Sequence, residues 1–529
     1  MKKMFKKIVM SAAIVVAGTA SVSAQTNLGA ACGCPSIASR PTVNMSTLAD
    51  GSGNLTAANT VLTCDKKWII NDKIFVGNGK SITIQPGTAL FATSTAGANA
   101  DALVISRGGK IFAAGTETCP IVFTAVSDPL DGTYSVGNQQ QWGGLVLLGR
   151  ATNNLLSIAC NGPQANAYQA NGIGLIEGFI AADPRAYYGA DLAGTFGPAE
   201  TFDDNDNSGI VRYVSLRHGG ATASTANELN GLTMGSVGRG TTIDHVEIVS
   251  NSDDGFEMFG GTVNLKYCAV QYNDDDAFDW DQGYRGKGQF WFAVKASGRG
   301  DNGFEMDSDD NHCLQSPTSR PIVYNATVIG DDTDAGLEAK ENTEGEIYNS
   351  IIANYNQGLN IYNQFPADVY TNWNANSFKV QNCTFVSNAQ SALTIQPAGS
   401  PVTATGGDVT KFTSEGNVDA GASIPGFDFT VAVTLTGSAL TAVTDLYDVS
   451  PSPVLTSTIT APSDGFFSPV NYRGAFATNA PSWLNNWSYA AFIDATNGLV
   501  PCPTDTNGDG VTNITDFNAV LGAFGTTCD

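Results

Sequence analysis

The segment 253–290, DDGFEMFGGTVNLKYCAVQYNDDDAFDWDQGYRGKGQF, contains the same short pattern twice. Phe256 and Phe278 are 22 residues apart, and each begins a run in which apolar and acidic side chains alternate. Along the chain, aligned apolar positions follow at steps of 24, 22, 26, 33, 22 and 34 residues: Leu232, Phe256, Phe278, Phe304, Leu337, Leu359 and Leu393. Alternation is typical of strands, and a repeat of about 22 residues is typical of stacked coils. We therefore expect a solenoid in which each coil adds one layer of strands.

A second column of apolar residues has the same spacing. It consists of Ile243, Leu265, Val323, Ile347 and Val380. Two residues further on, three of these coils carry an asparagine: Asn325, Asn349 and Asn382. Asparagine tolerates turn conformations, and its amide both donates and accepts hydrogen bonds. We expect these side chains to stack at a turn between strands.

Two motifs connect this solenoid with a known family. The stretch 82–88 reads ITIQPGT and the stretch 108–116 reads GGKIFAAGT, and both resemble right-handed parallel β-helix proteins. More narrowly, WGGLVLLGRA (142–151), GDNGFEMDSD (300–309) and the quoted segment resemble uncharacterised secreted β-helix proteins of Bacteroidetes and relatives. The resemblance covers roughly residues 68–490. It implies an all-β, right-handed parallel β-helix and no particular activity.

The chain ends divide the sequence further. Four lysines before the apolar run 8–17, followed by small residues at 22–24, predict a secretory signal peptide over 1–24 and an extracellular or outer cell-surface location. We expect an N-terminal disulfide-containing cap at 25–66, β-helix coils at 67–397, irregular β-rich terminal coils with an aromatic cap at 398–498, and a calcium-binding tail at 499–529. In the cap segment PSWLNNWSYAAF (481–492), Trp483 and Trp487 either cover the open end of the solenoid or form a carbohydrate platform.

Cysteines support this division. The chain has ten cysteines, and disulfides can form in an exported protein. Cys32, Cys34 and Cys64 cluster near the N-terminus, and Cys502 and Cys528 bracket the tail, so we expect disulfides at both ends. Cys268 and Cys383 lie inside apolar strand patterns and are expected to be buried thiols.

The charge balance excludes one class of partner. The chain has 50 acidic and 26 basic residues and a formal net charge of −24. Phosphate contacts need a basic surface, so a nucleic-acid partner is excluded, and no later apolar stretch is long enough for a transmembrane helix.

The tail carries the most specific motif. Its oxygen-bearing residues have the spacing of an EF-hand calcium loop, with Gly510 at the sharp turn and aspartate in place of the usual glutamate at the last position: Asp505, Asn507, Asp509, Val511 (through its carbonyl), Asn513 and Asp516. The loop resembles half of a dockerin. Because a dockerin has two such segments, the resemblance implies Ca²⁺ binding but leaves a cohesin-type partner doubtful.

The coils carry a second candidate site. Alternation places Glu257, Asp279, Glu305 and Glu338 in one outward column, and stacked like charges about 5 Å apart repel each other. Calcium bound by Asp279, Asp281, Glu305 and Asp307 would compensate this repulsion. The alternatives are protonated carboxyls, solvated surface acids, or the side chains of Lys340, Arg285 and Lys287 folded over the column.

Other polar residues favour structural roles. The pairs Asp253–Asp254, Asp275–Asp276 and Asp301–Asn302 precede strands and are expected to form turns. His218, His245 and His312 are too scattered to predict a triad or a zinc centre.

The sequence therefore favours a secreted or cell-surface structural or adhesion protein that binds glycan or a surface protein and is stabilised by Ca²⁺. The alternative is a calcium-dependent polysaccharide lyase or glycoside hydrolase acting on the coil face, with Arg285, Lys287 or Lys340 as the basic residue. No catalytic residue is assigned.

Overall fold

The computed structural model describes residues 28–93, 100–157, 171–179, 183–222, 228–296, 298–308, 314–365, 368–424, 434–436, 439–442, 455–477 and 480–492. The predicted signal peptide (1–24), the predicted calcium tail (499–529) and His312 lie outside these residues. Within them strands predominate, helices are short, and no helix is long and apolar enough to cross a membrane.

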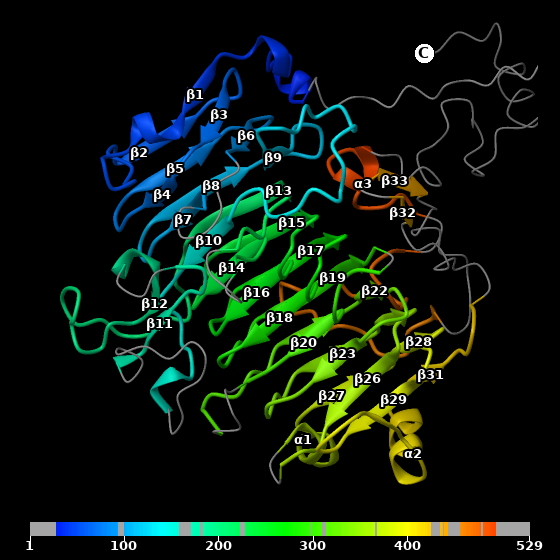
Figure 1. Ribbon diagram of the computed structural model, residues 1–529. Helices are drawn as coiled ribbons and strands as arrows, with labels where there is room; N and C mark the ends of the chain where they lie inside the picture. The colour runs from blue at the N-terminus through cyan, green and yellow to red at the C-terminus, as the bar shows by residue number, and fades with distance from the viewer. Residues whose placement is uncertain are drawn as a thin grey trace, which may run out of the picture.

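One face of the molecule is a sheet of eleven strands to which each coil contributes one strand (Figure 1). In spatial order the strands are β4 (Lys73–Val76), β7 (Ala102–Ile105), β10 (Gly144–Leu148), β14 (Leu232–Gly235), β16 (Phe256–Phe259), β18 (Phe278–Asp281), β20 (Phe304–Met306), β23 (Ala335–Ala339), β26 (Gln357–Tyr362), β29 (Ser391–Gln396) and β30 (Val402–Thr403). All neighbours are parallel except β30, which turns back on β29. We call this sheet the coil face.

The other strands form a second sheet of eighteen, in which most coils contribute two short strands or one long, bent strand. They are β1 (Thr42–Asn44), β2 (Asn59–Leu62), β3 (Lys67–Ile70), β5 (Ser81–Ile84), β6 (Ala89–Ala92), β8 (Lys110–Ala114), β9 (Ile121–Ala125), β13 (Gly209–Arg217), β15 (Thr242–Val249), β17 (Asn264–Gln271), β19 (Lys287–Val294), β21 (Ile322–Tyr324), β22 (Thr327–Ile329), β24 (Glu346–Tyr348), β25 (Ile351–Ala353), β27 (Lys379–Gln381), β28 (Thr384–Val386) and β31 (Val418–Asp419). With the coil face they enclose one continuous apolar core, as expected for a parallel β-helix.

The predicted repeat register is confirmed. Leu232, Phe256, Phe278, Phe304, Leu337, Leu359 and Leu393 are successive partners across the coil face. Their side chains point inward and stack, with ring centroids of Phe256 and Phe278 5.4 Å apart and those of Phe278 and Trp291 4.5 Å apart. The second predicted column is also in register, with Gly288 between Leu265 and Val323.

The corner inside the second sheet has left-handed backbone in seven successive coils. The residues there, with φ between 48° and 59°, are Tyr213, His245, Tyr267, Phe290, Asn325, Asn349 and Asn382. The first four rings stack with centroids 4.4, 4.4 and 4.9 Å apart. The predicted asparagine stack is confirmed between Asn382 Nδ2 and Asn349 Oδ1, 2.6 Å apart.

Residues 455–477 and 480–492, which include α3 (Tyr489–Phe492), cover the outside of this corner and the adjoining strands. Asn325 and Asn349 donate to the carbonyl oxygens of Tyr472 (2.8 Å) and Ile459 (2.7 Å). Trp487 is fully buried and Trp483 stacks on Phe476.

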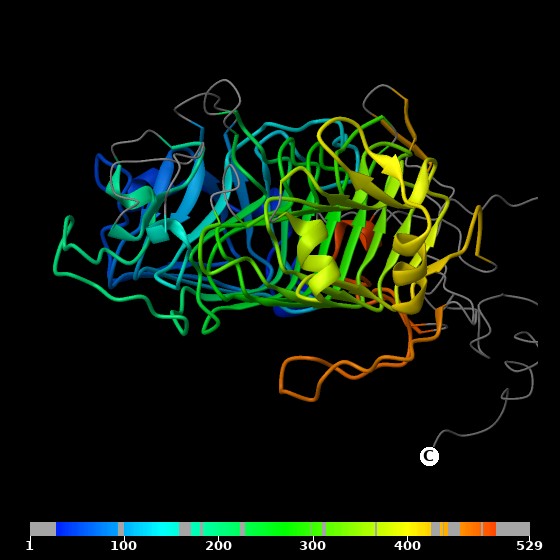
Figure 2. The ribbon, with the colours of Figure 1, turned by 90° about the horizontal axis from the view of Figure 1, so that it is seen from below.

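This position corrects the expectation that the tryptophans cover the open end of the solenoid. They cover a flank of the solenoid, where apolar side chains of the second sheet point outward, and buried Trp487 offers no face to a sugar. The open end is covered instead by α2 (Gly407–Ser414), whose Phe412 packs 5.1 Å from Phe385, beside α1 (Val369–Ala375) (Figure 2).

At the other end two disulfides join the first residues to the coils, Cys34 to Cys64 and Cys32 to Cys119. The disulfides expected near the N-terminus are thus confirmed, and Cys268 and Cys383 are buried free thiols as predicted. The disulfides are compatible with an extracellular protein. Cys502 and Cys528 lie outside the described residues.

An excursion interrupts the stack between β10 and β13. It contains the antiparallel hairpin of β11 (Ile173–Leu175) and β12 (Tyr187–Gly189), which lies against β10 and β14 (Figure 1). Tyr188 stacks on Phe259 with centroids 5.9 Å apart and donates to Gln282. We call the described residues 171–179 and 183–192 the excursion. A second small hairpin joins β32 (Thr434–Thr436) to β33 (Ala439–Ala442).

Candidate functional site

The turns that precede the coil-face strands are joined by a ladder of side chains. Asn230 Oδ1 accepts from the Asp254 backbone N–H at 3.2 Å, and Asp254 Oδ1 accepts from the Asp276 N–H at 3.0 Å. Asp276 Oδ1 and Asn302 Oδ1 continue the series at 2.6 and 3.0 Å. The expectation that these residues form turns through local hydrogen bonds is wrong for Asp254, Asp276 and Asn302, because each side chain accepts from the next coil rather than from its own turn.

The outward carboxylates beside this ladder are largely enclosed. Glu257 is 6% exposed and Asp279 is 8% exposed, whereas Glu305 and Glu338 are half-buried. Glu177 of the excursion and Asn230 lie over this part of the column, since Asn230 Nδ2 donates to both Glu177 (2.8 Å) and Glu257. The interpretation as solvated surface acids is therefore wrong for Glu257 and Asp279.

Farther along the column a lysine neutralises the acids. Lys340 Nζ forms ion pairs with Glu305, with Asp307 at 3.6 Å and with Glu338 at 3.8 Å. Burial lowers the pKa of Lys340, but these three carboxylates outweigh burial and hold it well above its usual value. The ammonium group is therefore fixed in its charged form.

The other two predicted basic residues point elsewhere. Arg285 lies 3.3 Å from Asp204, and Lys287 pairs with Asp464. They do not fold over the acidic column, so that expectation holds only for Lys340. A lysine that the sequence did not single out, Lys295, is buried beside the turns, where it donates to Asn273 Oδ1 at 3.0 Å and to the carbonyl of Asp275.

Three overlapping sets of carboxylates have oxygens within 4.8 Å of one another. The sets are Asp254, Glu257 and Asp279; Asp253, Asp254 and Asp275; and Asp275, Asp276 and Asp301. Of the predicted calcium ligands, Asp279 belongs to the first set. Glu305 and Asp307 instead contact Lys340, and Asp281 is the last residue of β18. Sequence reasoning missed Glu177 because its position depends on the path of the excursion, for which the repeat gives no signal.

Crowding of these carboxylates shifts their protonation. Burial, together with the charges of Glu177, Asp275 and Glu228, raises the pKa of Asp253 to about 8. Burial and the charges of Asp301 and Glu305 raise the pKa of Asp275 to about 6, although Lys295 opposes the shift. At neutral pH Asp253 is thus mostly protonated and Asp275 mostly ionised.

The described histidines have structural environments. His218 is buried, and its Nδ1 lies 2.7 Å from the carbonyl oxygen of Asn138. Burial lowers the pKa of His218 to about 4, so its ring is neutral. His245 is stacked in the aromatic corner. That the histidines form neither a catalytic triad nor a zinc centre stays a prediction.

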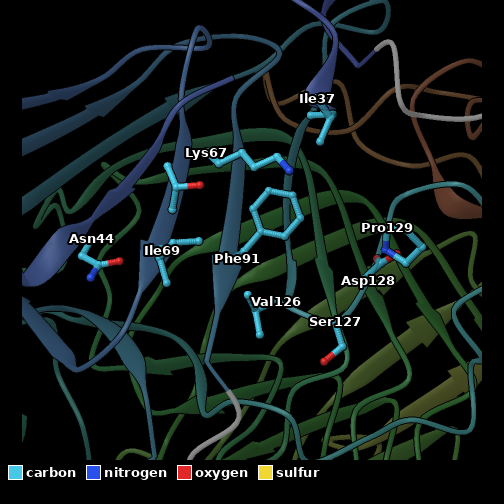
Figure 3. Close-up of a pocket in the computed structure, with 10 residues that line it drawn as sticks. Ile37, Asn44, Lys67, Ile69, Phe91, Val126, Ser127, Asp128 and Pro129 are labelled. Atoms are coloured by element: carbon cyan, nitrogen blue, oxygen red, sulfur yellow. The ribbon is translucent and has the colours of Figure 1, made fainter. Parts of the chain in front are cut away.

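A separate pocket of about 490 Å³ opens on the outer surface of β1, β3 and β6 near the N-terminal cap. Figure 3 shows the Phe91 ring at its centre, with the Lys67 amino group above the ring and Ser127 and Asp128 to one side. Lys67 Nζ lies 5.9 Å from the ring centroid. Lys67 has no carboxylate within 4.0 Å among the described residues, so its charge is available to a ligand.

Comparison with known proteins identifies the family. No curated protein and no solved structure matches the chain. A family described as a pectate-lyase-like beta-helix domain matches residues 53–171 and 193–427, which are most of the chain and nearly all of the coils. The interval between the two matched segments contains β11, Glu177 and β12. The repeat register, the parallel sheets and this match show that the chain belongs to the pectate-lyase-like β-helix domain family.

Proposed function

We propose that the protein is a secreted or cell-surface β-helix scaffold that binds an acidic polysaccharide, or a surface partner that carries one, and is stabilised by calcium. One observation carries this proposal: the carboxylates of the acidic column are either enclosed by the excursion or paired with Lys340. A lyase would need a basic residue free to remove a proton beside its carboxylates. Among the described residues, Lys340, Lys295, Arg285 and Lys287 are all engaged.

The pocket at Phe91 supports binding. Sugar-binding sites combine an apolar surface with a few polar groups that fix orientation. Phe91 supplies the apolar surface, Asn44 and Ser127 supply polar groups, and Lys67 supplies a positive charge that suits the carboxylate of a uronic acid. The family description names pectate lyase, and pectate is an acidic polysaccharide of this kind.

The test is binding of the mature chain to a panel of acidic and neutral polysaccharides, with and without chelator. We expect acidic polymers to bind and Lys67→Gln to weaken binding about tenfold, the effect of about 1.4 kcal/mol. Lys66→Gln is the matched control, because Lys66 is the neighbouring lysine, pairs with Asp65 and does not line the pocket. Equal losses in both variants, or binding to no polymer, would contradict the proposal.

One observation favours the alternative, a calcium-dependent lyase or glycoside hydrolase. A protonated Asp253 beside an ionised Asp275, with oxygens within 4.8 Å, is close to the acid and nucleophile pair of retaining glycosidases, whose carboxyls lie about 5 to 5.5 Å apart. Release of reducing or unsaturated ends from the same panel, abolished by Asp253→Asn, would establish the enzyme and displace the scaffold.

Calcium in the tail is part of the proposal. The ligand spacing of Asp505, Asn507, Asp509, Val511, Asn513 and Asp516 supports it, and the dockerin-like segment suits a small terminal module. The coil-face set predicted from the sequence, Asp279, Asp281, Glu305 and Asp307, also stays a proposal. Calcium uptake by the full chain that falls by one ion in Asp509→Ala would support the tail site.

A further inference from the structure

The positive charges near the acidic cluster are distributed unevenly. Glu305, Asp307 and Glu338 share Lys340. Asp275, Asp276 and Asp301 lie around buried Lys295; burial raises the pKa of Asp275 and Asp301, and the charge of Lys295 opposes this rise. No lysine or arginine nitrogen among the described residues lies within 4.0 Å of the carboxylates of Asp254, Glu257 and Asp279. The charge of Lys340 acts on Asp279 and that of Lys295 acts on Asp254, but neither lysine forms an ion pair with this last set.

The geometry of Asp254, Glu257 and Asp279 suits a divalent cation. Calcium binds carboxylate oxygens at about 2.4 Å, so two oxygens on one ion lie at most about 4.8 Å apart. One oxygen each from Asp254, Glu257 and Asp279 meets this limit.

A second observation concerns the Asp279 carboxylate of the same set. The Asp279 side chain is 8% exposed, and its buried Oδ1 has no hydrogen-bond partner. A buried carboxylate oxygen without a partner is costly, and a bound cation is one means of satisfying it. The Glu177 carboxyl lies next to this set, because it shares a hydrogen bond with Glu257 and accepts from Asn230 Nδ2 at 2.8 Å.

We propose that Asp254, Glu257 and Asp279 bind a structural calcium ion beneath Glu177, and that this ion fastens the excursion to the coils. The site differs from the set predicted from the sequence, since it shares only Asp279 with that set. It also uses Glu177, which lies between the two segments matched by the family and is therefore an addition to the shared fold. The inference refines the calcium-stabilised scaffold proposed above but does not require polysaccharide binding.

The test counts ions on the full mature chain. After equilibrium dialysis against calcium-45, Asp279→Asn is expected to hold one ion fewer per chain than the unmodified protein, whatever the tail contributes. Glu338→Gln is the matched control, because it removes an outward acid of the same column that pairs with Lys340, and it is expected to lose none. Loss of a direct ligand weakens binding by at least about 100-fold, since even supporting residues cost 10- to 100-fold.

A second variant keeps the inference testable if Asp279→Asn does not fold. Glu177→Gln removes the acid supplied by the excursion, and it is expected to weaken binding at this site at least about tenfold. Chelator is expected to accelerate proteolytic cleavage within the excursion of the unmodified chain, and Glu177→Gln is expected to reach the faster rate at a free calcium concentration at least about tenfold higher. Equal ion counts and affinities in the unmodified chain, Asp279→Asn and Glu177→Gln would overturn the inference, as would loss of an ion in Glu338→Gln alone. Because no polysaccharide is present, this result is independent of the binding test.

Discussion

Replacement of Lys340 by methionine tests how the coil face tolerates its acids. Lys340 is 23% exposed and holds Glu305, Asp307 and Glu338, the last two with N–O distances of 3.6 and 3.8 Å. At an effective dielectric constant of 20, each of these two attractions is about 4 to 5 kcal/mol before the cost of desolvating the lysine is subtracted. Removing one member of a partly buried ion cluster leaves the others uncompensated, and the expected net loss is about 3 to 5 kcal/mol.

The effect has a defined dependence on pH. Burial raises the pKa of Glu305, but Lys340 and a hydrogen bond from Asp276 lower it below its usual value. In the unmodified chain this contribution is present above the pKa of the unfolded carboxyl and is lost as the pH falls through the folded pKa. Without Lys340 the three acids are easier to accommodate when protonated, so the loss in Lys340→Met is expected to be smaller at pH 4 than at pH 7.

The assay is urea unfolding followed by tryptophan fluorescence at both pH values, with Lys379→Met as the matched control. Lys379 is 25% exposed and pairs with Glu346 at 3.1 Å, but Arg320 also holds Glu346 at 3.0 Å, so about 1 kcal/mol or less is expected. If Lys340→Met costs no more than Lys379→Met at pH 7, the reasoning about the acidic column is refuted. The same holds if its cost does not change with pH.

Two further outcomes follow from the same structure. In chelator, the urea midpoint is expected to fall as the pH rises from 5 to 8. The folded pKa values of Asp275 and Asp253, about 6 and about 8, exceed the unfolded value of about 3.9, so folding favours the protonated forms. Saturating calcium, or the double variant Asp253→Asn with Asp275→Asn, is expected to flatten this pH dependence, and a flat profile of the unmodified chain in chelator would contradict the pKa shifts. Phe278→Ala is expected to lower the free energy of unfolding in urea by about 3 to 5 kcal/mol, because the ring is fully buried between Phe256 and Phe304. The control Phe365→Ala, at a ring that is 43% exposed, is expected to cost about 1 kcal/mol or less. Comparable losses in the two variants would argue against the packed column.

The coil register was predictable because it depends on local alternation and a repeated spacing. Each apolar residue from Leu232 to Leu393 has its expected partner, since slippage by one residue would turn a whole strand outward. The carboxylate column was predictable in the same way. Its burial was not predictable, because Glu177 and Asn230 reach it from outside the repeat.

The tryptophan segment shows the same limit. Its aromatic composition indicated burial, and Trp487 is buried. Which surface it covers depends on outward residues of distant coils, such as Ala269 and Phe292, whose apolar character gives no sign of a partner some 200 residues later. The polar contacts of this segment are equally distant, since Asn349 donates to the carbonyl of Ile459.

The position of the excursion explains why one part of the acidic column has a lysine and another part does not. Lys340 follows Ala339, just beyond the outward Glu338, and from there it reaches back to Glu305. In β14 and β16 the corresponding end of the strand is occupied by Gly235 and Phe259, which are partners across the sheet. A Cβ at Gly235 would lie 2.5 Å from Cγ of Tyr188, and Phe259 stacks on the same tyrosine. A long basic side chain at either position would therefore displace the hairpin of β11 and β12. Docking of the excursion therefore takes the place from which a lysine could pair with Glu257 in the way that Lys340 pairs with Glu338.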